Sequence, residues 1–248
     1  SKMSVTVANY QYQFTTFNPS EVPVYVAGNE LKDLNIRQEF SNRNNLNFWI
    51  QTGVDYKWQE VTIDYRTGGT APDFQIVESK ASHSISPFGN LEYHGFKKWY
   101  FQMGLRATYF SLLDDFRAAP RLLMNFEPKP WMTLKSSFGT YNQYLSQVKN
   151  LEFGGGGFDD ELWTIADNDR GHIITGQQTM LGTILHQGTL LFDVEYFYKT
   201  ANDITNYGVR RLNISSDYFT MDQSTSGIDL LLKKEVTKSV FKTIVIFI

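Results

Sequence analysis

The side chains best suited to chemistry in this chain are its four histidines and its acidic residues. The histidines are His83, His94, His172 and His186, and no two of them have the spacing of a metal-ligand pair. Acidic residues are plentiful, for example Asp114, Asp115, Asp193 and Glu195, but no serine in a G-x-S-x-G element accompanies them. We therefore expect no catalytic residue, no metal site, no cofactor site and a protein that is not an enzyme.

Two further stretches match ligand-binding loops only in part. Residues 153–158 include four consecutive glycines but lack the Lys-Ser/Thr pair and the helix of a phosphate-binding loop. Residues 167–171 have the wrong spacing for an EF-hand, and Gln178 stands where the bidentate glutamate belongs. Two interpretations stay open for Asp159, Asp160 and Glu161, namely a calcium ion held in an outer loop or a solvated acidic loop.

Composition excludes several classes of protein. The chain has no cysteine, which excludes disulfide frameworks, thiolate metal sites and thiol catalysis. Its formal net charge of -3 argues against nucleic-acid binding. No apolar run reaches the roughly 18 residues of a transmembrane helix. A membrane β-barrel stays open, because its strands place apolar residues only at every second position.

Alternation of period two dominates the chain and predicts antiparallel strands with one apolar face and one polar face. The odd positions are apolar in residues 99–109, and the even positions are apolar in residues 190–198. Further strands are expected near residues 8–14, 32–40, 46–56, 85–93, 118–126, 132–138, 174–184 and 228–232, with an eleventh begun in 240–248. The phase slips near Glu60, after which Val61, Ile63 and Tyr65 are the apolar positions, and this slip predicts a β-bulge or a local twist.

The connections between these strands alternate in length. Short turns are expected at residues 41–45, 95–98, 127–129 and 187–188. Long loops are expected at 17–31, 68–82, 145–171 and 201–223, with 111–116 as a brief exception on the long side. In an up-and-down sheet this order places every short turn at one end, which is typical of outer-membrane barrels and not of soluble sandwiches.

The expected strands also sort polar and aromatic residues. Aromatic residues near strand ends suit the interfacial girdles of a barrel, and they are Trp99, Tyr100, Tyr109, Phe110, Phe126, Trp131, Tyr196, Phe197 and Tyr198. Charged residues of one strand face would line a single lumen, and they are Arg106, Arg117, Arg121, Lys135, Asp193, Glu195, Lys199, Asp229 and Lys233. Ligand contact would fall to loop aromatics, namely Phe158, Trp163, Tyr207, Tyr218 and Phe219, although loop aromatics often pack only their own loop.

Five stretches carry a resemblance to a known family. Residues 116–124 are similar to an apolar-x-x-Pro-Arg strand, and residues 131–145 resemble a strand that reads Lys, apolar, Ser, aromatic, Gly, aromatic, Gln. Residues 161–167 form part of a long loop, residues 192–199 are close to a Glu-x-Tyr-Tyr-Lys strand, and residues 226–234 resemble a Gly-x-Glu strand with Asp229 in place of glutamate. In this order and spacing they resemble the barrel of TonB-dependent outer-membrane receptors of the Bacteroidetes type. The good match covers residues 85–234, and the first 80 residues fit more loosely.

The resemblance implies an all-β fold, an antiparallel up-and-down transmembrane β-barrel segment of about ten or eleven strands. Residues 1–248 are then one partial barrel domain in the cell outer membrane, with the signal peptide, the TonB box, the plug domain and the remaining strands outside this chain. Such a receptor binds a scarce small-molecule, glycan or peptide ligand with its outer loops. Its partners are the lipid bilayer, the TonB–ExbB–ExbD complex and a surface lipoprotein, but no nucleic acid. The alternatives are a soluble β-sandwich module and a smaller outer-membrane porin or hydrolase barrel.

Overall fold

The computed structural model describes residues 1–21, 23–45, 47–67, 74–149, 161–167, 171–209, 216–236 and 239–247. The first seven strands are β1 (Lys2–Phe17), β2 (Pro23–Asn45), β3 (Phe48–Thr67), β4 (Phe74–Tyr93), β5 (Trp99–Phe110), β6 (Asp115–Lys129) and β7 (Met132–Gln143). The others are β8 (Leu145–Lys149), β9 (Glu161–Ile165), β10 (Ile174–Gln187), β11 (Leu190–Val209), β12 (Ser216–Val236) and β13 (Ser239–Phe247). Among the described residues, none belongs to a helix long and apolar enough to cross a membrane.

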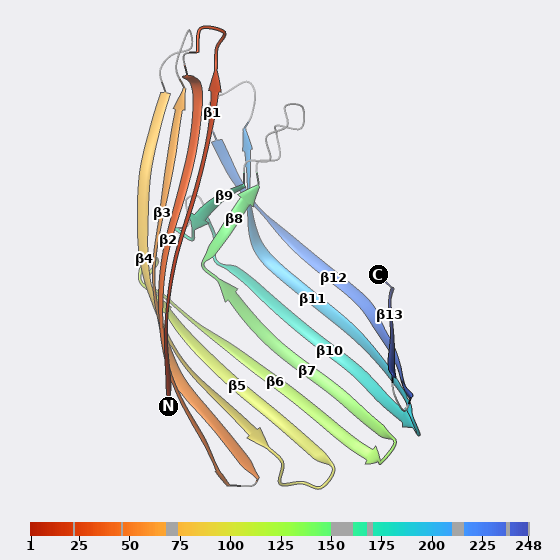
Figure 1. Cartoon of the computed structure of the whole chain (residues 1–248). Helices are drawn as coiled ribbons and strands as arrows, with labels where there is room; N and C mark the ends of the chain where they lie inside the picture. Colours follow the sequence, from red (N-terminus) through yellow and green to blue (C-terminus); the bar gives the residue numbers. More distant parts are fainter. Residues whose placement is uncertain are drawn as a thin grey trace.

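Eleven of these strands form one antiparallel sheet in which neighbours in space are also neighbours along the chain. The order is β1-β2-β3-β4-β5-β6-β7-β10-β11-β12-β13, and β8 and β9 form a separate two-stranded sheet (Figure 1). The predicted up-and-down sheet of ten or eleven strands is therefore confirmed. Strands β1 and β13 are the two edges of the sheet.

The strands differ in length in a way that corrects the predicted long loops. Residues 17–31, 68–82 and 201–223 are for the most part strand, because β2, β4, β11 and β12 run through them and pair there with a neighbour. Among the connections between strands of the large sheet, the one from β7 to β10 is the longest, and it contains β8 and β9. In Figure 1 the tight turns gather at the lower end and the extended hairpins rise at the upper end. The two ends of the sheet do differ as predicted, with short turns at one end, but at the other end longer strands take the place of most of the predicted loops.

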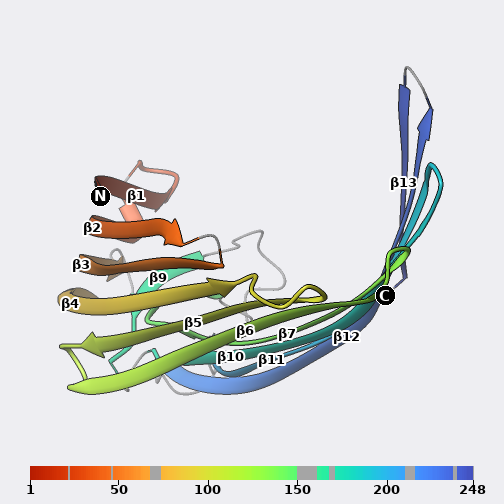
Figure 2. The same cartoon turned by 90° about the horizontal axis from the view of Figure 1, so that it is seen from below.

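The sheet is curved, and its two faces have opposite chemistry. Figure 2 shows a trough with β9 inside the curve, so the face that carries β8 and β9 is the concave face. Large apolar side chains stand exposed on the convex face, where Leu105 is 54% exposed and Leu181 is 57% exposed. Polar side chains are buried on the concave face, where Ser82 is 2% exposed and Thr108 is 7% exposed. This polarity is the reverse of that of a water-soluble domain, which buries apolar side chains.

The expected bulge near Glu60 is wrong. Strand β3 pairs with β2 and β4 in unbroken register on both sides of this residue, for example Gln59 with Asp33 and Val61 with Leu31. The apolar set instead changes from the convex face to the concave face. Val61 and Ile63 are buried there in a cluster that includes Leu31, Phe110, Ile165, Ala166 and Ile173. The slip in the sequence pattern thus marks the point at which the β8–β9 segment begins to cover the concave face.

Candidate functional site

The charged residues predicted to line one lumen do share the concave face. Register places Arg106 opposite Ala119, and Ala119 lies between Arg117 and Arg121 on one face of β6. Register then links Lys135 through Gly182 to Glu195, and Glu195 to Asp229. Residues an even number of positions apart on one strand share a face. Glu195 therefore shares its face with Asp193 and Lys199, and Asp229 shares its face with Lys233. This face of the sheet is the candidate functional site.

A buried carboxylate, Asp55, organises the first charge cluster of the concave face. Its side chain is 5% exposed, and its Oδ2 lies 2.6 Å from Arg106 Nη2 and 3.5 Å from Arg37 Nη1. Arg37 also pairs with Glu39 at 3.0 Å. Both guanidinium groups lie over the ring of Phe88, at 4.4 Å for Arg37 and 5.3 Å for Arg106. The cluster links strands β2, β3 and β5 through ion pairs, and it links them to β4 through the cation–π contacts with Phe88.

A second cluster lies further along the sheet. Lys135 Nζ donates to both oxygens of Asp193, at 2.8 and 2.9 Å, and also to Glu195 Oε1. The lysine side chain is only 12% exposed. One cation between two carboxylates leaves this part of the concave face with an excess of negative charge.

The β8–β9 segment lies across the concave face and is held at several points. Asn29 is 2% exposed, accepts a hydrogen bond from Trp163 N at 2.8 Å and donates to Trp163 O at 3.2 Å. Trp163 also meets Tyr10 edge-on at a ring-centroid distance of 6.3 Å. Strand β9 contacts β2, β3 and β4, whereas β8 contacts β11. The hairpin therefore joins the two sides of the trough, as Figure 1 shows.

An ion pair secures the segment that follows β9. Lys80 donates to Asp167 and also lies 3.1 Å from Glu78. Lys80 stands beyond the end of β5, on the part of β4 that pairs with β3 alone. Burial lowers the pKa of Lys80, but the hydrogen bonds to Asp167 and Glu78 outweigh it, so the pKa of Lys80 is raised above its ordinary value. Lys80 therefore stays charged at neutral pH.

Replacing Asn29 by alanine is expected to loosen this hairpin. The change removes its two hydrogen bonds with Trp163 and leaves buried backbone groups without partners, at a cost of about 1–3 kcal/mol. Hydrogen exchange of the amides in 161–167 should become faster in Asn29→Ala. Asn9→Ala is the matched control, because Asn9 lies exposed on the opposite face of β1. Equal exchange rates in the two variants would contradict the anchoring role of Asn29.

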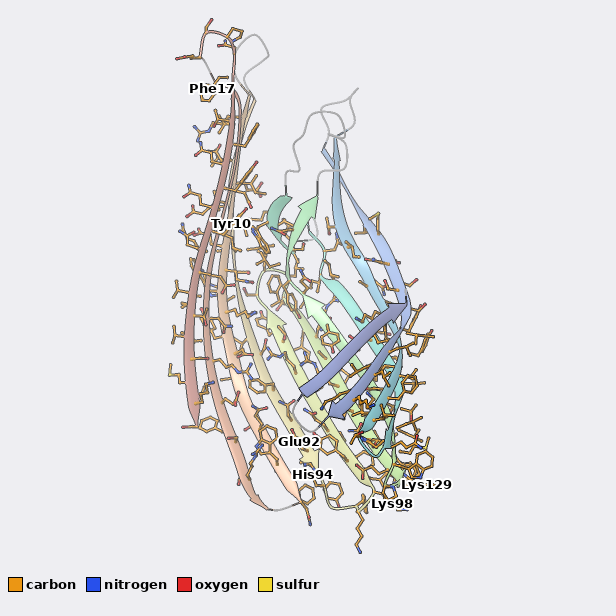
Figure 3. All side chains as sticks on the ribbon, turned by 45° about the vertical axis from the view of Figure 1, so that its right-hand side comes forward. Tyr10, Phe17, Glu92, His94, Lys98 and Lys129 are labelled. Carbon is orange, nitrogen blue, oxygen red and sulfur yellow. The ribbon has the colours of Figure 1, made fainter. Side chains whose placement is uncertain are left out.

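The histidines are not brought together. His83 Nδ1 lies 2.8 Å from the Tyr56 hydroxyl, and His94 Nε2 lies 3.7 Å from Glu92 near the short-turn end (Figure 3). The backbone N of His172 donates a hydrogen bond to Thr205 Oγ1 at 3.0 Å, and His186 is exposed. In the part of the chain that the structure describes, no three His, Asp or Glu residues are arranged to hold a metal ion. Residues 150–160, which include the glycine run, Phe158, Asp159 and Asp160, lie outside the described residues.

The predicted aromatic sets divide between the two faces. Trp99 stacks on Phe126 at 4.2 Å near the short turns, and Tyr109, Trp131, Tyr196 and Tyr198 are exposed as girdle residues should be. Tyr100, Phe110 and Phe197 contradict the girdle prediction, since register places them on the concave face, where Phe110 is 1% exposed. Of the loop aromatics, Trp163 packs against the buried cluster. Tyr207, Tyr218 and Phe219 belong to β11 and β12 and not to a loop.

Two grooves indent the concave face between these clusters. One of 300 Å³ is lined by residues of β7, β10, β11 and β12, and one of 340 Å³ by residues of β4, β5, β6, β7 and β10. The two grooves share Tyr141 and Gln178. Their linings combine hydroxyl and amide groups with the cations Arg121 and Lys199. Each groove therefore has one cation that can bind an anionic group, Lys199 in the first and Arg121 in the second.

Replacing Gly53 by alanine is expected to disturb the Asp55 cluster. A Cβ at Gly53 would lie 2.4 Å from Gln38 O and 2.6 Å from the Phe88 ring, so the ring that supports both arginines must move. Overpacking of this kind costs about 1–3 kcal/mol. Urea unfolding in detergent measures the loss. Gly89→Ala, whose nearest neighbour would be 3.9 Å away, should change little, and an equal effect at both positions would refute the argument.

Neither a protein-family model nor a curated protein sequence matches this chain. Solved structures do match. The copper transporter OprC is 14% identical with a TM-score of 0.65, over 95% of this chain and 41% of OprC. The ferric enterobactin receptor PfeA of Pseudomonas aeruginosa is 13% identical with a TM-score of 0.66, over 98% of this chain and 41% of PfeA. The siderophore receptor PirA of Acinetobacter baumannii is 10% identical with a TM-score of 0.59, over 97% of this chain and 40% of PirA.

The chain spans about two fifths of the length of these three structures, which are 41%, 41% and 40% covered. At these identities the likeness concerns the fold and not the ligand. The chain has the fold of part of the β-barrel of TonB-dependent receptors, an antiparallel up-and-down sheet with an apolar convex face and a polar concave face.

Proposed function

We propose that this chain is part of the transmembrane barrel of a TonB-dependent outer-membrane receptor that takes up a scarce ligand. The observation that carries the proposal is the reversed polarity of the sheet. A row of exposed leucine, methionine and aromatic side chains on the convex face is stable against lipid, whereas in water it would drive aggregation. The buried charges of the concave face then line the lumen.

Strand length supports a membrane span. Strands β5 and β7 have 12 residues each. At about 3.3 Å per residue a strand of this length is about 40 Å long, and a tilt near 45° reduces its height to about 28 Å. That height is close to the apolar band of about 25 Å in outer-membrane barrels. The longer strands β2, β3, β4, β11 and β12 would project beyond the membrane on one side.

The two edge strands are the second argument. An open sheet edge is unstable in lipid, because no water is present to satisfy its backbone groups. Strands β1 and β13 are the edges of this sheet, so we infer that further strands complete the barrel. The soluble β-sandwich alternative needs a second layer over the convex face, and in the described ranges the convex side chains are exposed. A smaller porin or hydrolase barrel is the remaining alternative.

The ligand and the partners are part of the proposal and follow from the family. The names of the similar structures concern copper, ferric enterobactin and siderophores, so a scarce metal or its chelate is the first ligand class to test. Coupling to TonB–ExbB–ExbD and a surface lipoprotein partner would follow from membership in the family. The Bacteroidetes type rests on the five sequence stretches, whereas the similar structures with a stated source come from Pseudomonas and Acinetobacter.

Fractionation of the source cells tests the proposal. The protein should appear in the outer-membrane fraction, require detergent for extraction and migrate faster in SDS gels before heating than after it. Proteolysis of intact cells should cleave the extended hairpins at the end of the sheet opposite the short turns. Recovery of a monomeric protein from the soluble fraction without detergent would reject the proposal.

A further inference from the structure

A cavity of 480 Å³ lies at the short-turn end of the sheet, between the turn that follows β4 and the adjoining ends of β5 and β6. Register places Trp99 on the convex face and Tyr100 on the concave face, and both line the cavity, so it lies at the rim where the two faces meet. Its volume is within the range of about 300–1,000 Å³ that is usual for small-molecule sites. Its charged and amide-bearing lining includes Lys97, Lys98, Asn125 and Glu127.

Aromatic rings form a belt on the convex side of this cavity. Phe48 packs against Tyr93 with ring centroids 4.7 Å apart, and Tyr93 packs against Phe96 at 5.2 Å. Trp99 stacks on Phe126 at 4.2 Å. In the proposed barrel such rings lie at the level of the lipid headgroups, with the apolar band on one side and water on the other. The cavity therefore lies at headgroup depth, next to the lipid-facing side chains.

Two lysines lie close together at this rim. Lys98 Nζ donates a hydrogen bond to Pro128 O at 3.2 Å, which fixes the ammonium of Lys98 at the end of β6. Lys129 follows directly in the chain and lies over the Trp131 ring at 5.3 Å, and Figure 3 shows Lys98 and Lys129 at the same end of the sheet. An ammonium has three donors, so Lys98 keeps donors for a second acceptor. Within the described ranges neither lysine forms an ion pair, so both can bind a phosphate.

One carboxylate accompanies the two lysines. Glu127 N donates to Lys98 O at 2.8 Å, so Glu127 lies directly opposite Lys98 at the rim. The other acid nearby, Glu92, already has a partner, since its Oε2 lies 3.7 Å from His94 Nε2. Glu127 is exposed and, among the residues that the structure describes, forms no ion pair. The cavity thus combines unpaired cations with an unpaired anion beside them, which distinguishes it from a simple basic patch.

We propose that this cavity binds the headgroup of an ethanolamine phospholipid from the leaflet at the short-turn end. The phosphate accepts hydrogen bonds from Lys98 and Lys129, and the ammonium donates to Glu127. An O–CH₂–CH₂ link joins the phosphorus to the ammonium nitrogen in this headgroup, so both charges fit within one cavity. The acyl chains follow the convex face past Trp99 and Phe126, where the aromatic belt meets the apolar band.

Other headgroups match these side chains less well. A glycerol phospholipid carries no cation for Glu127, and the quaternary ammonium of a choline phospholipid has no N–H to donate. Inorganic phosphate would engage the lysines alone. The carboxylate of Glu127 beside the lysines is therefore the reason to favour ethanolamine.

The inference relies on the proposed function only for the location of the sheet in a membrane. Lipid retention by the complete protein tests it. The protein is stripped of lipid in detergent and placed in nanodiscs of equal parts dioleoyl phosphatidylethanolamine, phosphatidylglycerol and phosphatidylcholine. Native mass spectrometry then identifies the lipids that stay bound after release from the nanodisc. The ethanolamine lipid should exceed each of the other two by about tenfold, as one further hydrogen bond between charged groups predicts.

Charge variants locate the bound lipid. Lys98→Gln with Lys129→Gln should lower the retained ethanolamine lipid by about tenfold or more, because both phosphate contacts are lost. Glu127→Gln should equalise the ethanolamine and glycerol lipids, because only the ammonium contact is lost. The matched control is Arg43→Gln with Lys234→Gln, which removes two cations from the same end of the sheet but away from the cavity, and it should leave retention unchanged. Slower migration after heating in SDS gels verifies that each variant is folded.

Soluble glycerophosphoethanolamine separates the headgroup from the whole lipid. It carries the same charges without acyl chains, so at equal concentration it should not displace the bound lipid. Displacement at equal concentration would show that a soluble phosphoester, and not a membrane lipid, is the occupant.

Three other results would overturn the proposal. They are equal retention of the three lipids by the wild type, unchanged retention in the lysine double variant, and an equal loss in the control. Detergent dependence of the same preparation tests the proposed function separately. A detergent-dependent protein without selective lipid retention rejects only the headgroup site, whereas a detergent-free soluble protein rejects the receptor function.

Discussion

Replacing Asp55 by alanine is expected to produce the largest loss of stability among single changes on the concave face. The side chain of Asp55 is 5% exposed, and its carboxylate is the shared partner of Arg37 and Arg106. Its removal leaves Arg37 and Arg106, which both lie over the Phe88 ring, without their shared countercharge, and only Arg37 keeps a second partner, Glu39. Removing one partner of a buried ion pair costs about 3–5 kcal/mol. Urea unfolding of the protein in detergent, followed by tryptophan fluorescence, measures this cost.

A conservative change separates charge from shape in the same experiment. Asp55→Asn keeps the volume and one acceptor oxygen but removes the negative charge. Its free energy of unfolding should therefore lie between that of the wild type and that of Asp55→Ala. Asp229→Ala is the control, because Asp229 is exposed on the same face and lies outside the cluster. The double variant Asp55→Ala with Arg106→Met should recover most of the loss, because Arg106 then leaves no charge behind and Arg37 keeps its ion pair with Glu39. A loss as small as that of Asp229→Ala would show that the cluster does not stabilise the sheet.

Replacing Leu105 by arginine is expected to produce the second largest effect and to test the membrane orientation of the sheet directly. Leu105 is 54% exposed on the convex face, in the middle of β5. On the lipid face of a barrel an arginine near the bilayer midplane costs about 2–4 kcal/mol. In water the same change at an exposed leucine would be nearly neutral. Insertion yield into lipid vesicles and unfolding free energy should both fall.

The matched control lies next to Leu105 on the same strand. Gly104 and Arg106 are its neighbours and face the concave side, and Gln102 shares that side. Gln102→Arg should therefore be tolerated, because the concave face is polar and, in the proposed barrel, wet. If Gln102→Arg were as harmful as Leu105→Arg, the assignment of lipid to the convex face would be wrong. If neither change had an effect, the sheet would not lie in a membrane.

The sequence reached the fold class because alternation is a local property. A residue and its second neighbour always share a strand face, so the charged set from Arg106 to Lys233 could be assigned to one side before any pairing was known. The strand count followed from the same pattern, and so did the short turns near residues 95–98 and 187–188. The turns expected at 41–45 and 127–129 lie a few residues later, after the ends of β2 and β6. The Glu60 slip was misjudged for the same reason, since an apolar residue on the concave face has the same sequence pattern as a bulge. The β8–β9 segment covers that face through contacts between residues far apart in the sequence, which a local pattern does not contain.

Long strands were missed where their chemistry is mixed. Residues 17–31 and 201–223 contain glycine, asparagine and charged residues, which are typical of loops, yet they extend β2, β11 and β12. Each of these segments pairs with a neighbour along its length, and pairing outweighs local preference.

The sequence did not predict the ion pair between Arg37 and Asp55. The turn expected at residues 41–45 would place Arg37 opposite Trp49 in the neighbouring strand. The turn lies three residues later, and this shift brings Arg37 opposite Asp55.

By itself the sequence determined that this protein is an antiparallel β-sheet with one apolar and one polar face, that it has about eleven strands and that its two ends differ. Only the tertiary structure decided which face is inside the curve, that the β8–β9 hairpin crosses it, and which cations lie over aromatic rings. The reason is physical: strand faces follow from the two-residue repeat of the backbone, whereas curvature, register and ring–cation contacts depend on residues that meet only after the strands have paired.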